Sequence, residues 1–242
     1  MDSARDRLIV ALDVPTAAEA QRIVTALGES ISTYKVGKQL FTAAGPAAVR
    51  VLTGAGHKVF LDLKFHDIPN TVAAAIRAAS ELGVAMLTVH ASGGSKMLKA
   101  AVEAAGSAQH PPRVLAVTVL TSFDDSDLKE IGVAAQTMEQ ALRLASLAQK
   151  AGCSGVVASA REAQAIRREL GPDFAIVTPG VRPAGGSKDD QARVATPSEA
   201  IAAGATHIVV GRPITGAKDP AVAARAILDE ISPKVLAQGI RA

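Results

Sequence analysis

Cysteine and aromatic residues are scarce in this sequence. Phe, Tyr and Trp make up 2% of the 242 residues, Trp does not occur, and Cys153 is the single cysteine. One cysteine excludes an internal disulfide framework and a CxxC metal site. A chain without disulfides is compatible with a reducing cytoplasm. The core therefore has to be built from Ala, Val, Ile and Leu, and this favours helices packed closely on a sheet of branched residues.

Long runs of a single character are also missing. No apolar run is long enough to cross a membrane, and the run at residues 8–12 is too short for a signal peptide. The 26 Lys and Arg are interspersed with 23 Asp and Glu, so the net charge is only +3. Such mixed charge gives little support for nucleic-acid binding. We therefore expect a cytoplasmic protein that binds neither nucleic acid nor membrane.

The sequence does contain a regular alternation of short apolar runs and helical patterns. The apolar runs predict buried parallel strands at 7–12, 33–36, 59–63, 85–89, 113–120, 155–157, 174–177 and 207–210. Helical patterns lie at 16–27, 46–55, 70–82, after 94, and at 137–150, 162–170, 197–203 and 220–236, with a short helical insert at 124–131.

Eight strand–helix alternations without a break in composition predict one (β/α)8 barrel, with residues 1–242 as a single domain. A doubly wound open sheet is the alternative. It would be expected to carry a Gly-rich fingerprint after its first strand, where this chain has Asp13-Val14-Pro15. The polar, Gly-rich stretch at about 183–194 is too long for a tight connection and predicts a mobile loop, either a functional lid or a disordered segment.

Charged and apolar residues are combined most closely in residues 61–71, Leu-Asp-Leu-Lys-Phe-His-Asp-Ile-Pro-Asn-Thr. Successive side chains of a strand point to opposite faces, so Asp62 and Lys64 are expected to share one face. Burying such charges is costly unless they satisfy each other or have a function. A purely structural ion pair is the alternative interpretation. A second carboxylate, Asp67, follows in the turn before Pro69.

Polar residues also close the other predicted strands, and the carboxyl ends of the strands form the active sites of such barrels. The candidates are Asp13, Lys35, Asp62, Lys64, Asp67, His90, Thr121, Arg182 and Arg212. Alternating ammonium and carboxylate groups of Lys35, Asp62, Lys64 and Asp67 would keep Lys64 charged and able to donate a proton. For Asp13, the alternative interpretation is that it caps the helix that begins near Thr16.

A phosphate site is predicted after strands seven and eight. Arg182, Gly211 and Arg212 follow these strands, where barrels frequently bind phosphate, and the planar guanidinium of Arg donates two hydrogen bonds at once. For Arg212 alone, a solvated turn residue is the alternative. His66 and His90 suggest a metal site, but there is no HExxH or other short ligand spacing, so we predict no metal.

The string from Asp62 to Thr71 resembles the signature of the orotidine 5'-monophosphate decarboxylase family in its bacterial form. The resemblance covers nearly the whole chain and includes residues 11–13, 35–37, 89–94, 117–122, 178–183 and 210–213. The Asp-x-Lys-x-x-Asp core alone is shared with sugar-phosphate decarboxylases and synthases of the same suprafamily. Ile68-Pro69-Asn70-Thr71 and the segments of Arg182 and Arg212 favour the orotidine phosphate enzymes.

The resemblance implies catalytic roles for Lys64, Asp62, Asp67 and Lys35. Lys64 would protonate C6 of the pyrimidine as carbon dioxide leaves, and Asp62 would face the substrate carboxylate. It also implies a set of substrate-binding residues: Asp13, Lys35, Asp62, Ile68, Thr71, Thr121, Ser122, Pro179, Arg182, Gln191, Gly211 and Arg212. Asp13 and Lys35 would hold the ribose hydroxyls. Thr121 or Ser122 would meet the base.

The phosphate would be gripped by Arg182, Gly211 and Arg212, and Gln191 would bridge the base and the phosphate from the loop. The resemblance further implies a homodimer in which Asp67, Ile68 and Thr71 reach the partner's site. Orotidine 5'-monophosphate would be the substrate and UMP the product, with no metal or organic cofactor. The alternatives are a Mg-dependent keto-sugar-phosphate decarboxylase or hexulose-phosphate synthase, and a catalytically silent barrel that only binds nucleotide phosphate.

Overall fold

The fold is a closed barrel of parallel strands surrounded by helices, seen in a computed structural model that describes residues 3–183 and 195–232. Eight strands pair in chain order, and β1 pairs in parallel with β8 to close the barrel. The strands are β1 (Leu8–Ala11), β2 (Thr33–Gly37), β3 (Lys58–Phe65), β4 (Met86–His90), β5 (Arg113–Val117), β6 (Gly155–Val157), β7 (Ala175–Thr178) and β8 (His207–Val210). The predicted (β/α)8 barrel is confirmed.

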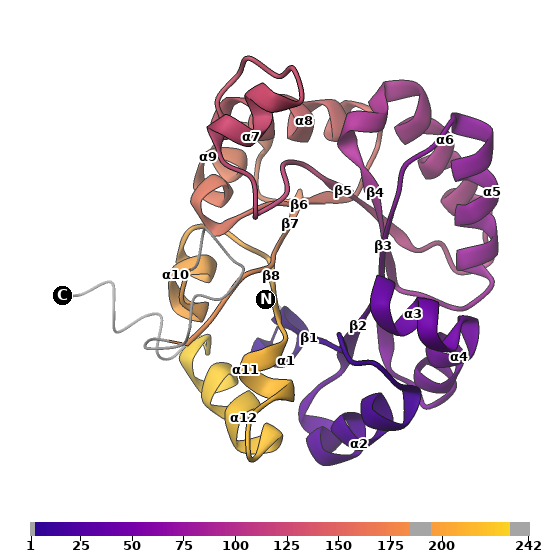
Figure 1. Cartoon of the computed structure of the whole chain (residues 1–242), viewed down its shortest axis with the longest axis vertical. Coiled ribbons are helices and arrows are strands. Elements are labelled where there is room, and N and C mark those ends of the chain that lie inside the picture. Colours follow the sequence, from indigo (N-terminus) through magenta and orange to yellow (C-terminus); the bar gives the residue numbers. More distant parts are fainter. Residues whose placement is uncertain (1–2, 184–194, 233–242) are drawn as a thin grey trace.

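The helices form a ring outside the strands (Figure 1). They are α1 (Ala4–Arg7), α2 (Ala17–Leu27), α3 (Lys38–Ala44), α4 (Pro46–Gly54), α5 (Pro69–Ser80), α6 (Gly94–Gly106), α7 (Asp125–Glu130), α8 (Thr137–Lys150), α9 (Ala160–Leu170), α10 (Pro197–Ala202), α11 (Arg212–Thr215) and α12 (Pro220–Glu230), with 3-10 turns η1 (Gly28–Ser30) and η2 (Ala91–Gly93). The short helices α1, α3 and α11 were not predicted. The predicted strand at 113–120 ends at Val117, and the part of the last predicted helix beyond residue 232 lies outside the described residues.

Two apolar layers explain why the strands read as continuous apolar runs. One layer fills the barrel interior and consists of Ile9, Ala11, Phe60, Met86, Leu115, Val117, Val157, Ala175, Val177 and Val209. The other lies between the strands and the helices and is rich in Val, Ile, Leu and Ala. Because both faces of each strand are covered, alternation of polar and apolar residues would be penalised. The interior is thus a packed core, so a ligand site of the barrel is expected at its end.

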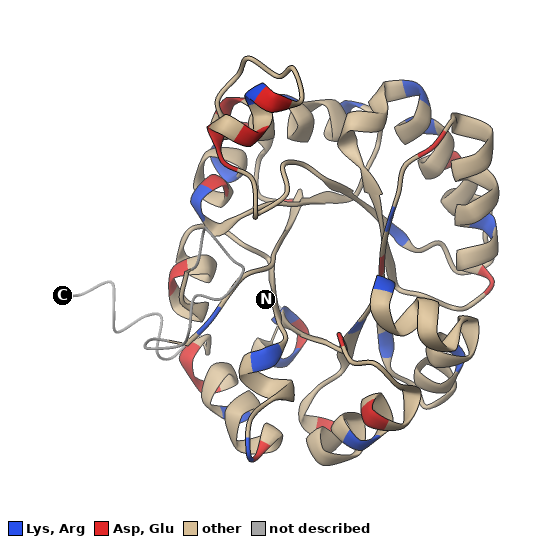
Figure 2. Ribbon diagram, viewed as in Figure 1, with Lys and Arg blue, Asp and Glu red and all other residues tan. Residues whose placement is uncertain are grey.

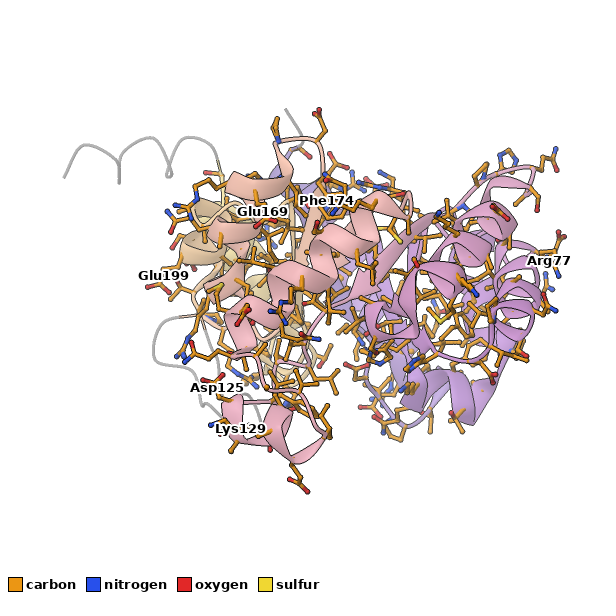
Figure 3. All side chains as sticks on the ribbon, turned by 90° about the horizontal axis from the view of Figure 1, so that it is seen from above. Arg77, Asp125, Lys129, Glu169, Phe174 and Glu199 are labelled. Carbon is orange, nitrogen blue, oxygen red and sulfur yellow. The ribbon has the colours of Figure 1, made fainter. Side chains whose placement is uncertain are left out.

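The two ends of the barrel differ in the segments that adjoin the strands. At the carboxyl end, α7 comes after β5 and projects from the barrel with Asp125 and Lys129 (Figure 3). Asp124 caps this helix by accepting hydrogen bonds from the N–H groups of Ser126 and Asp127. Phe174, which precedes β7, lies at the opposite end in the same view. The long connection after β5 therefore stands beside the mouth of the barrel.

Charged residues lie mainly on the outer helices, where both signs are mixed around the ring (Figure 2). Such mixing agrees with the interspersed charges of the sequence. None of the helices in residues 3–183 and 195–232 combines the length and the apolar character that spanning a bilayer requires.

Candidate active site

A pocket of about 480 Å³ opens at the carboxyl end of the barrel, within the volume range of small-molecule sites. The predicted site residues that line it are Asp13, Lys35, Asp62, Lys64, Thr121, Pro179, Arg182, Gly211 and Arg212. They come from the ends of β1, β2, β3, β7 and β8 and from the connection after β5. The barrel thus brings together residues that are almost 200 positions apart in the sequence, at the end where such barrels carry their chemistry.

Four of these side chains form a continuous chain of alternating charge on one side of the pocket. Lys35 Nζ lies 2.8 Å from Asp13 Oδ1 and 3.6 Å from Asp62 Oδ2. Lys64 Nζ donates to both carboxylate oxygens of Asp62, at 2.7 and 2.8 Å. Within one chain, the array of alternating charges therefore contains Asp13 in place of the predicted Asp67.

Asp62 is the shared partner of both ammonium groups. Its side chain is 12% exposed. Burial acts to raise the pKa of this carboxyl, but the charges of Lys64 and Lys35, with hydrogen bonds from Lys64 and Thr88, outweigh burial, so the pKa lies below its ordinary value. Asp62 therefore stays ionised at neutral pH and stabilises two cations at the mouth of the barrel.

The end of β3 departs from regular strand geometry at Lys64. Lys64 has φ of 55°, the one positive φ among the described non-glycine residues, and such a conformation costs roughly 1–2 kcal/mol. The register of β3 against β4 shifts between Leu61 and Phe65. The Lys64 N–H donates to Thr88 Oγ1 of β4 at 2.9 Å, and Thr88 Oγ1 donates to Asp62 Oδ1 at 3.0 Å. Strain of this kind is typical of functional sites and has to be held by surrounding contacts.

Asp13 and Gly37 show how the ends of β1 and β2 serve the site. Helix α2 is capped by Thr16, which accepts from the N–H of Glu19, so Asp13 is not its cap and is left to bind Lys35. A Cβ on Gly37 would lie 2.6 Å from Asp13 Oδ1 and 2.8 Å from Lys35 Nζ. Glycine at this position therefore leaves the space in which the ion pair forms.

The opposite side of the pocket carries two arginines, Arg182 and Arg212, and the backbone of Gly211, which lies close to β1. Arg182 follows β7, is 7% exposed, and its N–H donates to the carbonyl of Ala195 at 3.0 Å. Gly211 and Arg212 follow β8, and a Cβ on Gly211 would lie 3.5 Å from the Cβ of Ala11. Two arginines on this side of the pocket make an arrangement suited to a phosphate monoester.

Residues 6–227 match the sequence model of the Orotidine 5'-phosphate decarboxylase / HUMPS family. The chain belongs to this family. It is 55% identical over 234 residues to orotidine 5'-phosphate decarboxylase of Moorella thermoacetica, covering 94% of this chain and 93% of the relative. With the enzyme of that name from Halorhodospira halophila it shares 56% identity over 226 residues, 93% of this chain and 96% of the relative.

A solved structure agrees with this relationship. The crystal structure of orotidine 5'-phosphate decarboxylase from Lactobacillus acidophilus is similar with a TM-score of 0.83 at 42% identity, covering 93% of this chain and 98% of that one. The resemblance expected from the sequence is therefore confirmed at the level of the orotidine 5'-phosphate decarboxylase / HUMPS family and its barrel.

Four of the residues predicted from the family signature do not line the pocket in the described part of the single chain. Asp67, Ile68 and Thr71 are exposed at the start of α5, and Ser122 is exposed after β5. The Asp67 carboxylate accepts from the N–H of Ile68 at 2.6 Å. Gln191 and most of the predicted loop fall in residues 184–194, outside the described residues.

The family signature did not single out Thr88, although its hydroxyl contacts Asp62 and the Lys64 backbone. Its position is separated from Asp62 by 26 residues, and only the pairing of β3 with β4 brings the two together. A polar residue in the middle of the apolar run 85–89 was the available signal. Nothing in its spacing to the charged motif indicated a contact.

The remaining candidates lie beside the site or away from it. The rings of His66 and His90 are 5.5 Å apart, and no group of three His, Cys, Asp or Glu in the described ranges could hold a metal ion. Burial, followed by the charges of His66, Lys64 and Lys38, lowers the pKa of His90 to about 4. Cys153 is buried in the apolar layer between the strands and the helices, and burial raises the pKa of its thiol to about 12, which leaves it protonated.

Proposed function

We propose that this protein decarboxylates orotidine 5'-monophosphate to UMP and carbon dioxide in de novo pyrimidine biosynthesis, in the cytoplasm and with no metal or organic cofactor. The observation that carries the proposal is the chain Asp13–Lys35–Asp62–Lys64, which places a held ammonium group in the pocket opposite two arginines. The relatives with more than 90% mutual coverage that bear this enzyme's name support the same substrate.

The difficulty of the reaction explains why an ammonium group is needed. When the bond between C6 and the carboxylate breaks, its electron pair stays on C6, and the ring offers no conjugated position to receive the charge. A cation fixed beside C6 stabilises the developing carbanion without reorganising solvent. Lys64 Nζ then gives a proton to C6, which completes UMP, and the neutral amine takes a proton back from solvent.

Asp62 has two effects in this proposal. Its ionised carboxylate holds Lys64 Nζ through two hydrogen bonds of 2.7 and 2.8 Å, so the acid is oriented before the substrate arrives. It would also face the substrate carboxylate, and repulsion between the two anions is relieved when neutral carbon dioxide leaves. Both effects favour the transition state over the bound substrate.

One ion pair is too small a source for the barrier reduction that such a reaction requires, because enzymes lower barriers by roughly 8–23 kcal/mol. Binding of the phosphate, remote from C6, supplies further energy that positions the base. We assign the phosphate to Arg182, Gly211 and Arg212, and the base to Thr121, Ser122, Pro179 and Gln191. Asp13 and Lys35 would bind the ribose hydroxyls, since they form a polar pair between Asp62 and solvent.

A second chain completes the site in this proposal. Ile68 is 66% exposed although it is apolar, and it stands beside the exposed Asp67 and Thr71 at the start of α5. Exposed apolar residues next to a polar site are typical of contact surfaces. A homodimer in which Asp67, Ile68 and Thr71 enter the partner's pocket would bury Ile68 and bring a second carboxylate to Lys64.

The test is the loss of orotidine 5'-monophosphate absorbance with purified protein in excess EDTA. Wild type is compared with Lys64→Ala, and with Lys99→Ala on the exposed face of α6 as the matched control. We expect rapid turnover by wild type and Lys99→Ala, and a loss of at least about 10³-fold in kcat for Lys64→Ala, since the variant loses both the fixed charge and the acid.

No turnover by folded wild type would refute the proposal. Turnover of a keto-sugar phosphate that depends on Mg²⁺ would then favour the sugar-phosphate enzymes, whereas tight UMP binding without turnover of either substrate would favour a silent barrel. Decarboxylation by wild type in D₂O should place deuterium at C6 of UMP, which proton NMR detects.

A further inference from the structure

Thr88 closes a ring of hydrogen bonds around the reactive pair. Its hydroxyl accepts from the Lys64 N–H at 2.9 Å and donates to Asp62 Oδ1 at 3.0 Å. Lys64 Nζ completes the ring by donating to the same carboxylate oxygen at 2.7 Å. The backbone and the ammonium group of Lys64 are thereby connected through one neutral hydroxyl and one carboxylate.

The side chains around Thr88 inside the barrel are otherwise apolar. Met86, two residues earlier on β4, belongs to the apolar interior of the barrel, and Leu115 and Val117 of the neighbouring β5 do as well. Thr88 itself is 0% exposed. Valine has nearly the shape of threonine, so packing alone would be satisfied by Val, and a buried hydroxyl is stable there only because both of its hydrogen bonds are made.

The Thr88 hydroxyl lies where the regular pairing of β3 with β4 is interrupted. Between Leu61 and Phe65 of β3 the chain advances four residues, while β4 advances two, from Leu87 to Val89. Thr88 lies opposite this irregular segment, and its side chain provides the acceptor for the Lys64 N–H. The positive φ of Lys64, 55°, directs this residue's side chain back to Asp62, so the contact that holds the backbone also sets the direction of the acid.

We infer that Thr88 is a positioning residue for the decarboxylation, which holds Lys64 in its left-handed conformation and fixes the rotamer of Asp62. The inference rests on the function proposed above. Without the hydroxyl, the Lys64 N–H loses its acceptor and Asp62 loses one of its donors, so the ammonium group is no longer held at one place in the pocket. Because Thr88 is not among the pocket-lining residues, its loss should affect the chemical step more than substrate binding.

Three variants test this inference. Thr88→Val removes the hydroxyl and keeps the shape, and Thr88→Ser keeps the hydroxyl. Thr178→Val is the matched control, because Thr178 is also a strand residue of 0% exposure, and its hydroxyl has no hydrogen-bond partner among the described residues. For each variant kcat and KM for orotidine 5'-monophosphate are measured, together with UMP affinity and thermal unfolding.

We expect Thr88→Val to lower kcat by about tenfold or more, with KM and UMP affinity changed by less than about threefold, since misplacement of a catalytic group by 1 Å can cost up to about 10²-fold. Thr88→Ser and Thr178→Val should stay within about threefold of wild type. A residue that only stabilises the fold would lower the unfolding temperature and leave kcat of the folded protein unchanged.

The outcomes separate the two proposals. If wild type is active and Thr88→Val keeps the wild-type kcat, the positioning role alone is overturned. The same holds if Thr88→Ser is as impaired as Thr88→Val. Folded wild type that is inactive on orotidine 5'-monophosphate would overturn the proposed function and this inference with it. Should Thr88→Val be insoluble, Thr88→Cys gives the same test, because a thiol of similar size is a weak donor and acceptor.

Discussion

Asp62 of β3 and His90 at the end of β4 lie on neighbouring strands, and both have lowered pKa values. For the carboxyl, the lowered pKa means that the charged form persists. For the imidazole, whose pKa falls to about 4 mainly through burial, it means that the neutral form persists. A neutral His90 does not compete with Lys64 for Asp62, so the charge distribution next to the acid stays constant across neutral pH.

The lowered pKa of His90 predicts that the free energy of unfolding depends on pH. The unfolded chain binds a proton at His90 near its ordinary value of 6.5, whereas the folded chain binds it only near pH 4. Between these values the unfolded state holds more protons, so the free energy of unfolding decreases as the pH falls. Urea midpoints measured from pH 7 to pH 4 should show this decrease in wild type and a weaker one in His90→Gln.

The control for His90→Gln is His110→Gln, since His110 is exposed between α6 and β5, before the amino end of that strand. This variant should follow the wild-type curve. A His90→Gln curve parallel to that of wild type over the whole range would show that His90 is not held neutral by the fold.

Among single residues, the charged members of the site could be predicted because each lies in or directly after a recognisable strand. Lys35, Asp62 and Lys64 interrupt strand patterns, Asp13 follows one, and the closed barrel is sufficient to bring them together. The positive φ of Lys64 could not be predicted, because regular alternation was the expectation for β3, and the pattern of residue types does not reveal a register shift. Thr88 was missed for the same reason.

At the scale of elements, α3 and α4 show where prediction from the pattern stops. The pattern predicted a strand at 33–36 and a helix at 46–55, with no helix between them. In the structure the short helix α3 begins directly after Gly37, and this turn leaves room for Lys35 and Asp13. The glycine that precedes the short helix thus also serves the site, a link that local propensity does not encode.

Arg167 connects elements at the amino end of the barrel. From α9, its guanidinium donates to the carbonyls of Gly171, Pro172 and Phe174 at 2.6–2.8 Å, and to Gly204 at 2.9 and 3.2 Å. It fixes the connections that lead into β7 and β8. We expect Arg167→Met to lower the free energy of unfolding by about 1–3 kcal/mol, because several carbonyls, most of them partly buried, lose a charged donor.

The prediction for Arg167 is checked by urea unfolding together with kcat. Arg168→Met is the control, because Arg168 is exposed on the same helix and its loss should change stability by less than about 0.5 kcal/mol. Activity of folded Arg167→Met should equal that of wild type, since the amino end of the strands lies opposite the pocket. Equal stabilities of the two variants would contradict the connecting role.

For the whole molecule, the decisive property is whether one chain holds a complete site. The single chain presents Lys64 in its pocket and Asp67 outside it, with α5 carrying Asp67, Ile68 and Thr71 on an exposed surface. Arg77, later on the same helix, points outward from the ring (Figure 3). In a two-fold dimer each chain would give the same surface to its partner, so both sites are completed at once.

Mixing two inactive variants tests this arrangement. In a hybrid of Lys64→Ala with Asp67→Ala, the site of the Asp67→Ala chain keeps its own Lys64 and receives Asp67 from the other chain. If subunits exchange at random, half of the dimers are hybrids and each has one complete site of two, so the mixture should regain about a quarter of wild-type activity.

Lys64→Ala mixed with Asp62→Ala is the matched control, because Lys64 and Asp62 serve the same chain's site and no hybrid of these variants contains a complete one. Its activity should stay at the level of the separate variants. Mass analysis of differently tagged chains measures how far the subunits have exchanged. Complete exchange without recovery in the Lys64→Ala and Asp67→Ala mixture would mean that Asp67 serves its own chain or none, and a monomer in sedimentation would exclude the shared site.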